Sequence, residues 1–142
     1  MEPIMEFVIT IDRSETTRME CENGKVTFIP FGGSVSSKLF TGTIRPGAAD
    51  VQVTNGAGIR HMCASYIFEG VDENNESCHL FVNNNGYFEP ASSPKPFHAC
   101  PTFMSDSKVL NDYLSAPFFR AEGHSQPYGV LIKIFDIRKE EN

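Results

Sequence analysis

The sequence predicts an all-β protein, a closed antiparallel β-barrel of about eight strands with one short helix. Short segments in which apolar and polar residues alternate are separated by turn signals about every 8–12 residues, a spacing typical of sandwiches and barrels. Aromatic residues, which favour strands, are abundant, with 12 Phe and 4 Tyr. Tight turns join most neighbouring segments, so we expect a meander, and closing it removes the exposed sheet edges.

Length and composition are those of an ordinary globular protein. The chain has 142 residues, 40% hydrophobic and 21% charged, and we expect one domain over residues 1–142. The net charge of −6 and the lack of a basic run disfavour nucleic acid as a partner. No apolar run approaches the roughly 20 residues of a membrane span, and the N-terminus lacks the features of a signal peptide. We therefore expect a cytoplasmic protein that binds neither nucleic acid nor membrane.

The first predicted elements are two strands joined through a polar segment. Residues Met5–Asp12 alternate cleanly and predict a half-buried strand, and Arg13–Glu22 is expected to be a connection. Asn23-Gly24 predicts a hairpin turn into a strand over Lys25–Phe31. Gly32-Gly33 predicts a turn or bulge.

The central elements surround a Pro-Gly turn. A strand is predicted over Lys38–Arg45, and Gly42 inside it marks a bend or a close backbone approach. Pro46-Gly47 turns the chain into a strand over Asp50–Thr54. The segment Arg60–Val71 is a long alternating strand, and one of its faces carries Arg60, Met62, Ala64, Tyr66 and Phe68.

The C-terminal part contains the only helical pattern. A strand over Ser77–Val82 is expected to end in a turn at Asn83–Gly86, because Asn and Gly tolerate positive φ. The proline-rich segment Phe88–Pro101 predicts an ordered loop or lid. Apolar spacing predicts a helix over Ser105–Leu114, capped by Ser105 or Asp106. Strands over 118–122 and 128–138 complete the chain.

Asp50 is the candidate catalytic residue. It follows the Pro46-Gly47 turn and enters a strand at the mouth of the predicted barrel. In a partly apolar cavity, desolvation raises the pKa of a carboxyl group and suits it to general acid or base catalysis. The alternative is a structural acid that accepts backbone N–H bonds in the Ala48-Ala49 turn.

Arg60, Tyr66 and Asn83 are candidate ligand-binding residues. Arg60 and Tyr66 share a strand face, so a guanidinium and a phenol would polarise a carbonyl near Asp50, and Asn83 would help to shape the pocket. The alternative is an arginine at the rim and a tyrosine whose hydroxyl reaches the surface. These residues predict a barrel that binds a small hydrophobic ligand and moves a proton on it.

The competing hypothesis is a non-catalytic binding or structural barrel whose interior is filled by side chains. An eight-stranded barrel is just wide enough for side chains or one small ligand. The hypothesis therefore depends on whether five aromatic residues all point inward: Phe7, Phe28, Phe40, Phe68 and Phe81.

The histidines and cysteines do not predict a metal site. His61-x-Cys63 and His98-x-Cys100 each place both side chains on one strand face, unlike the C-x₂-C turns of known zinc sites. Without a secretory signal, we expect the four cysteines to be reduced thiols. No phosphate-binding glycine loop or nucleophile elbow is present, and no cofactor is expected.

A family resemblance runs through much of the chain. Gly32-Gly33, a strand around Gly42 and then Pro46-Gly47-Ala48-Ala49-Asp50-Val51 resemble the pattern of DUF3237, a domain-of-unknown-function family also called UPF0311. Further matches follow in the same order: Ala64 and Tyr66, Phe81-Val82-Asn83 with Gly86, Pro101-Thr102-Phe103, Tyr113-Leu114-Ser115, and Phe119 with Gly123.

The resemblance implies a barrel similar to those of allene oxide cyclase and the lipocalins. Some fungal members of the family are cyclases that close a ring on a bound polyketide without a cofactor. The resemblance therefore implies a cofactor-independent cyclase or isomerase that acts on a hydrophobic metabolite. Val51 and Tyr113 stand where the family usually has tryptophan, so a pocket lined by them would take a different ligand. Tyr113 and Phe119 are therefore further candidates for ligand binding. The resemblance and the aromatic-rich composition also imply a homodimer that covers apolar surface.

Overall fold

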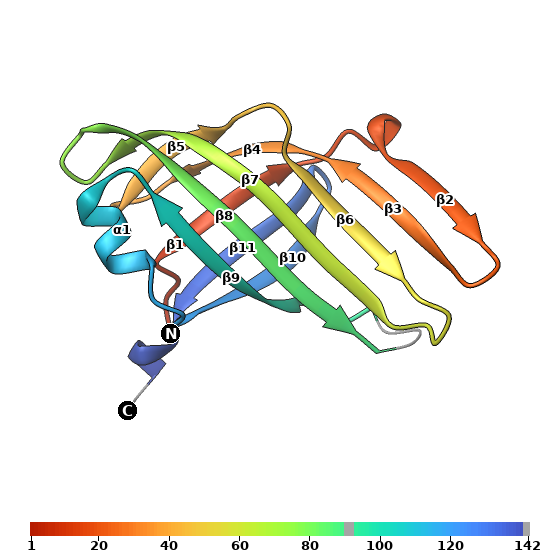
Figure 1. The fold of residues 1–142 in the computed structure, drawn as a ribbon. Coiled ribbons are helices and arrows are strands. Elements are labelled where there is room, and N and C mark those ends of the chain that lie inside the picture. Colours follow the sequence, from red (N-terminus) through yellow and green to blue (C-terminus); the bar gives the residue numbers. More distant parts are fainter. Residues whose placement is uncertain (90–92, 141–142) are drawn as a thin grey trace.

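The computed structural model describes residues 1–89 and 93–140 and confirms an all-β barrel. Within these residues there are eleven strands and one α-helix (Figure 1). The elements are β1 (Met5–Thr10), β2 (Thr17–Cys21), β3 (Gly24–Pro30), β4 (Gly32–Ser36), β5 (Phe40–Ile44), β6 (Ala49–Thr54), β7 (Arg60–Asp72), β8 (Ser77–Phe88), β9 (Phe97–Ser105), α1 (Lys108–Leu114), β10 (Phe119–Gln126) and β11 (Gly129–Asp136), with 3-10 turns at Arg13–Glu15 and Ile137–Glu140.

Eight of the strands form a closed ring. The sheet order is β2-β3-β6-β7-β5-β4-β1-β11-β10-β9-β8, and β8 also pairs with β7. That last pairing closes a barrel of β7, β5, β4, β1, β11, β10, β9 and β8. Every pair of neighbouring strands in the ring is antiparallel, as the sequence predicted.

The remaining strands form a flange, which we define as β2, β3 and β6. The long strand β7 has two partners on one edge: its first half pairs with β6 and its second half with β5. The Pro46-Gly47 turn joins these two partners. The wall therefore divides along β7, and β6, β3 and β2 fan away from the barrel (Figure 1).

Aromatic side chains fill the part of the barrel that lies away from the flange. Phe7 packs on Phe68 with ring centroids 4.8 Å apart, and Phe40 and Tyr66 pack on the same Phe68 ring. Phe28 and Phe81, by contrast, are 44% and 38% exposed. Of the five phenylalanines that would fill the barrel if all pointed inward, only Phe7, Phe40 and Phe68 are buried in the core. These five residues therefore do not fill the interior.

The alternation of β7 gives the barrel its inner and outer faces. Met62, Ala64, Tyr66 and Phe68 are buried, whereas the residues between them are more exposed. The inward row is the face that the sequence predicted. Gly42 lies where predicted, at a close approach, because a Cβ there would be 2.6 Å from the carbonyl oxygen of Glu69.

The predicted turn at Asn83–Gly86 is wrong, because β8 continues unbroken to Phe88. The outward asparagines are held by side chains of β7: Asn83 donates to Ser65 Oγ at 2.7 Å, and Asn85 bonds to His61 Nε2 at 3.0 Å. These cross-strand bonds keep turn-forming residues in extended conformation.

Three other predictions for the backbone are wrong. Arg13–Glu22 contains strand β2, and Gly32-Gly33 begins strand β4 instead of making a turn. Gly33 has a φ of 149°, and a Cβ there would be 2.0 Å from the carbonyl oxygen of Val8, so glycine permits the close pairing of β4 with β1. The predicted loop Phe88–Pro101 contains the start of β9; its residues 90–92 lie outside the described residues.

The helix begins later than predicted. It spans Lys108–Leu114, and its N-cap is Ser107, whose hydroxyl accepts from the backbone N–H of Leu110. Leu110 and Leu114 are buried against the barrel, as their spacing predicted. Among the described residues, α1 is too short to cross a membrane.

Candidate functional site

A small cavity of about 50 Å³ lies where the flange leaves the barrel. Its walls are mostly apolar and come from β1, β3, β7 and β11, with Ile29, Met62 and Ile132 among them. Its polar lining consists of Asp50, Tyr66 and Asn84. An apolar cavity with a few convergent polar groups is the usual form of a small-molecule site.

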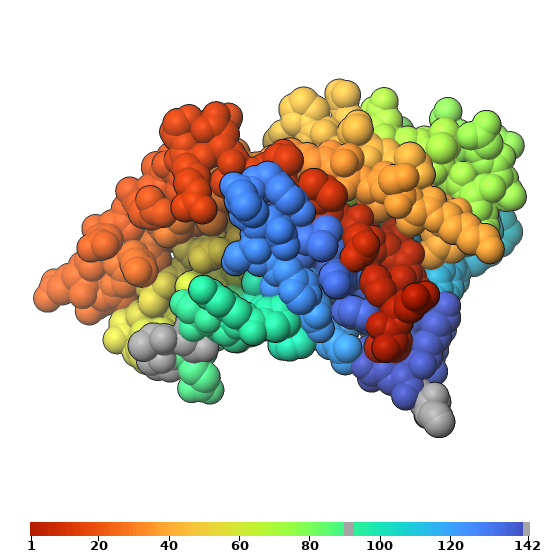
Figure 2. All heavy atoms as spheres, turned by 180° about the vertical axis from the view of Figure 1, so that it is seen from behind, coloured from red at the N-terminus to blue at the C-terminus, as the bar shows by residue number. Residues whose placement is uncertain are grey.

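The cavity adjoins a wider vestibule of about 270 Å³. The two share six lining residues: Ile11, Ile29, Asp50, Met62, Phe97 and Val130. Seen from behind the barrel, a hollow lies between the orange-red flange and the blue β10–β11 hairpin (Figure 2). The vestibule gives the inner cavity an approach from solvent.

Asp50 is fixed at the boundary between cavity and vestibule. In the sheet it stands between Ile29 of β3 and Ala64 of β7, on the inward face. Gln52, the next inward residue of β6, donates to Asp50 Oδ2 at 2.8 Å. The other oxygen, Oδ1, is buried and has no hydrogen-bond partner among the described residues.

The electrostatics of Asp50 follow from this burial. Desolvation raises the pKa of Asp50, and the Gln52 hydrogen bond and the charge of Arg60 oppose that shift less strongly. The alternative of a turn acid held by backbone N–H groups gains no support, because the hydrogen bond found for Asp50 comes from the Gln52 side chain.

Tyr66 and Asn84 lie at the inner end of the site. Tyr66 is buried, and Phe31 covers its ring edge-on at 5.0 Å between centroids. Burial first, and the Asp50 charge second, raise the pKa of Tyr66 well above its usual range, so the phenol remains a hydrogen-bond donor. Asn84 is 3% exposed, and its Oδ1 has no partner within the described chain.

Arg60 lies at the outer end of the same row of β7. It lines the vestibule, and its guanidinium carbon is 4.5 Å from the centre of the Phe88 ring. Its Nε is buried without a partner among residues 1–89 and 93–140. The structure thus brings Arg60, Asp50 and Tyr66 into one connected space.

Asn83 lies outside this space. Its side chain is on the outer face of β8, bonded to Ser65, and the neighbouring Asn84 lines the cavity instead. The expected turn hid the strand alternation that places Asn84 in the inward row with Leu80 and Val82. Gln52, which orients Asp50, was also missed, although its position two residues after Asp50 puts both on one face.

Tyr113 lies in α1 and Phe119 begins β10, and neither residue lines the Asp50 cavity. Tyr113 donates to Asp136 Oδ2 at 2.7 Å, and Phe119 is buried against the Tyr113 ring. Arg138 first and Tyr113 second lower the pKa of Asp136 to about 2. Burial, followed by the bond to Asp136, raises the pKa of Tyr113 to about 12.

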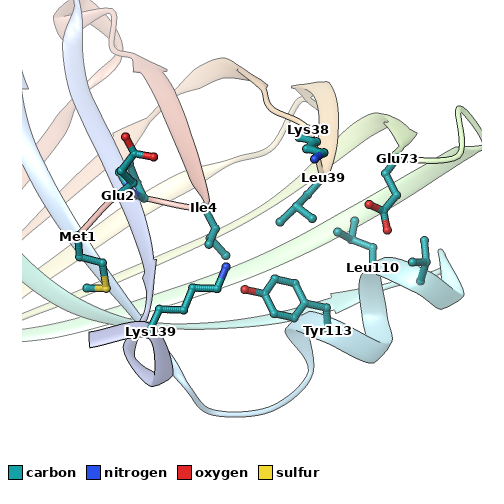
Figure 3. Close-up of a pocket in the computed structure, with 11 residues that line it drawn as sticks. Met1, Glu2, Ile4, Lys38, Leu39, Glu73, Leu110, Tyr113 and Lys139 are labelled. Carbon is teal, nitrogen blue, oxygen red and sulfur yellow. The ribbon is translucent and has the colours of Figure 1, made fainter. Parts of the chain in front are cut away.

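Tyr113 also lines a larger, open hollow of about 720 Å³ beside α1 (Figure 3). Charged side chains of both signs surround this hollow, including Lys38, Glu73 and Lys139. None of the buried unpartnered atoms found in the described chain lines it. We therefore place the candidate site at Asp50.

The two His-x-Cys pairs lie on separate strands. His61 and Cys63 are on β7, His98 and Cys100 are on β9, and β8 runs between them. Over the described ranges, no group of three His, Cys, Asp or Glu side chains is arranged to hold a metal ion. The expectation of no bound metal stays a prediction.

The fold and the site define a closed β-barrel with a side flange and one half-buried acid where the two meet. The chain belongs to the DUF3237 family of proteins of unknown function, whose model matches residues 1–98. This match includes Asp50, Arg60, Tyr66 and Asn84 and ends before Tyr113 and Phe119.

Solved structures of uncharacterised proteins share the fold. A protein of unknown function from Clostridium acetobutylicum is 24% identical, with a TM-score of 0.70 over 94% of this chain and 93% of that one. A conserved protein from Rhodopseudomonas palustris is 22% identical, with a TM-score of 0.70 over the same shares of the two chains. A beta-barrel like protein from Acinetobacter baumannii is 18% identical, with a TM-score of 0.68 over 94% and 92%. No curated protein matches the chain.

Proposed function

We propose that this protein binds a small, mostly apolar metabolite in the vestibule and the cavity behind it, and that Asp50 transfers a proton to or from it without a cofactor. The observation that carries the proposal is the state of the Asp50 carboxyl. One oxygen is held by Gln52, and the other is buried in an apolar wall with no partner among the described residues. A fixed carboxyl group with one free oxygen and a raised pKa suits a general base.

The reaction class that suits this arrangement is proton abstraction next to a carbonyl. Asp50 Oδ1 would take the proton from the carbon, and the electron pair would move to the carbonyl oxygen to form an enolate. The Tyr66 phenol, which stays protonated, supplies a donor for that oxygen. Return of the proton to another carbon gives an isomerase, and attack of the enolate carbon on a second carbonyl gives a cyclase.

A non-catalytic barrel is the second candidate, because aromatic side chains occupy part of the interior. Phe7, Phe40 and Phe68 are at most 1% exposed, and the inner cavity is only about 50 Å³. A ligand would therefore bind mainly in the vestibule and reach inward with a few atoms. Under this alternative, Asp50 would bind a ligand without proton exchange.

Hydrogen–deuterium exchange separates the two candidates. A panel of small cyclic and aromatic ketones is incubated in D₂O with the wild-type protein, and deuterium uptake beside the carbonyl is followed by NMR. We expect enzyme-dependent uptake for at least one ketone. Asp50→Asn should slow this uptake by about 10²–10⁴-fold, the usual contribution of a general base.

The matched control is Glu20→Gln, which changes an acid to its amide on the exposed strand β2 of the same flange. This variant should exchange like the wild type. Exchange that persists unchanged in Asp50→Asn would exclude Asp50 as the base. Binding of the ketones without exchange in either protein would favour the non-catalytic barrel.

A further inference from the structure

Arg60 lies at the entrance of the site, where it forms no ion pair with the residues that the structure describes. It begins β7 and stands opposite Thr54 of β6 and Phe88 of β8. Its Nε is buried without a partner within the described ranges, which is costly for a charged group.

The charges that face the vestibule have an excess of cations. Its charged lining residues are Asp50, Arg60 and Lys95. Asp50 lies at the inner end, where burial disfavours its charge. The entrance therefore presents Arg60 and the exposed Lys95 to an incoming molecule, and it favours an anion.

The positions along β7 separate this entrance from the reactive end. Three residues separate Arg60 from Ala64, so their Cα atoms are about 14 Å apart along the extended strand, and Asp50 stands opposite Ala64. Gln52 and Met62 stand opposite each other at the position between Arg60 and Asp50, and the apolar side chains of Phe97 and Val130 line the same vestibule. The order is thus a cation, a mostly apolar stretch and then the half-buried acid.

We infer that the ligand of this site is a small monocarboxylate whose carboxylate binds Arg60 and whose apolar body extends towards Asp50. This inference rests on the proposed function and assigns its ligand class. A guanidinium offers a planar pair of donors that matches a carboxylate. The vestibule of about 270 Å³ has room for one ring with a short side chain, since an apolar cavity of about 150 Å³ holds benzene.

A matched pair of probes tests the ligand class. Phenylacetate and phenylacetamide have nearly the same shape and differ in charge. Each is titrated into the full-length protein, and the methyl signals of Ile29, Met62 and Val130 are followed by NMR. We expect phenylacetate to bind at least about tenfold more tightly, the effect of one charged hydrogen bond.

Arg60→Met keeps a long apolar side chain beside Phe88 and removes the charge. This variant should bind both probes equally well. If it does not fold, Arg60→Lys replaces it and should retain only part of the preference, because an ammonium lacks the planar pair of donors. Arg18→Met, on the exposed strand β2, should preserve the full preference.

The outcomes distinguish the ligand class from the proposed function. Equal binding of the acid and the amide in the wild type would overturn the inference, while ketone exchange through Asp50 could still stand. Failure of both probes to shift the cavity methyl signals would overturn it as well. A preference for the acid that survives in Asp50→Asn and disappears in Arg60→Met would support it independently of catalysis.

Discussion

The two oxygens of Asp50 have different surroundings, and this difference determines what the residue can do. Oδ2 accepts from Gln52, which fixes the orientation of the carboxyl group. Oδ1 is the buried oxygen without a partner in the described chain. An acid that served only to hold the fold would be expected to use both oxygens, because an unpartnered buried acceptor costs stability.

The raised pKa of Asp50 predicts how stability changes with pH. The folded-state pKa lies above the 3.8 of an unperturbed carboxyl group, so protonation favours the folded state. The stabilisation of the folded state by the protonated Asp50 carboxyl is fully present below about pH 3.8 and is lost as the pH rises through the folded-state pKa. Asp50→Asn cannot ionise, so its free energy of unfolding should gain on that of the wild type between pH 4 and pH 7, by about 1 kcal/mol.

Urea unfolding of both proteins at several pH values measures this difference. Glu20→Gln, an exposed acid-to-amide change, serves as the control and should track the wild type. If Asp50→Asn instead loses about 1–3 kcal/mol at pH 7, the carboxylate stabilises the fold and the prediction is wrong.

At the residue level, the sequence predicted that Arg60 and Tyr66 share the inward face of β7, but it did not predict that Asn84 and Gln52 line the same site. Arg60 and Tyr66 could be placed together because strict alternation over a long strand assigns faces without further information. Asn84 could not be placed with them from the sequence, because a run of asparagines ending in glycine has the composition of a turn. The extended conformation of this run is supported by side-chain bonds of the neighbouring Asn83 and Asn85 to β7, which only the assembled sheet provides.

At the level of elements, the strands missed from the sequence lack a buried alternating face or contain residues that usually break strands. All five residues of β2 are exposed, so no apolar pattern marks it. Strand β9 contains Pro101, which is tolerated because the pairs between β9 and β10 end at Ala99. Strand β2 is held by its hairpin partner β3, and β9 is held between β8 and β10.

Helix α1 depends on a cap that has two functions. The Ser107 hydroxyl accepts from Leu110 N–H and donates to Asp72 Oδ2 at 2.6 Å, which ties the helix to the end of β7. Ser107→Ala should therefore lower the free energy of unfolding by about 1–2 kcal/mol. Ser115→Ala, at the exposed end of the same helix, should change it by about 0.5 kcal/mol or less. Equal effects in thermal or urea unfolding would contradict a special role for Ser107.

At the level of the whole molecule, the eight-stranded ring was predictable and the flange was not. Turn spacing and alternation predict the number of strands and favour a closed barrel. They do not show that one strand can have two partners on the same edge. That arrangement depends on the length of β7, whose 13 residues exceed what either β5 or β6 can cover.

The outer face of the barrel leads us to propose a homodimer. Large apolar side chains on β7, β8 and β9 are exposed: Ile67, Phe81, Tyr87 and Met104. Exposed apolar patches of this kind commonly mark contacts between proteins. In a symmetric homodimer, the same patch of a second copy would cover this face. Light scattering should give twice the chain mass for the wild type and the chain mass for Phe81→Lys.

Met19→Lys is the control for this experiment, because Met19 is also apolar and is more exposed than Phe81 (57% against 38%) but lies on β2, away from the proposed interface. It should remain dimeric. A wild-type protein that scatters as a monomer at working concentration would exclude the homodimer.

The division of the wall at β7 also separates two kinds of evolutionary freedom. The closed ring has no free edge, and none of the buried core residues found in the described chain belongs to β2, β3 or β6. Ile29 and Gln52 belong to the flange and line the site. Substitutions there alter the shape of the binding space while every hydrogen-bonded pair of the ring remains. Under the proposed function, relatives with this architecture would diversify their ligands by mutation of the flange and keep the barrel unchanged.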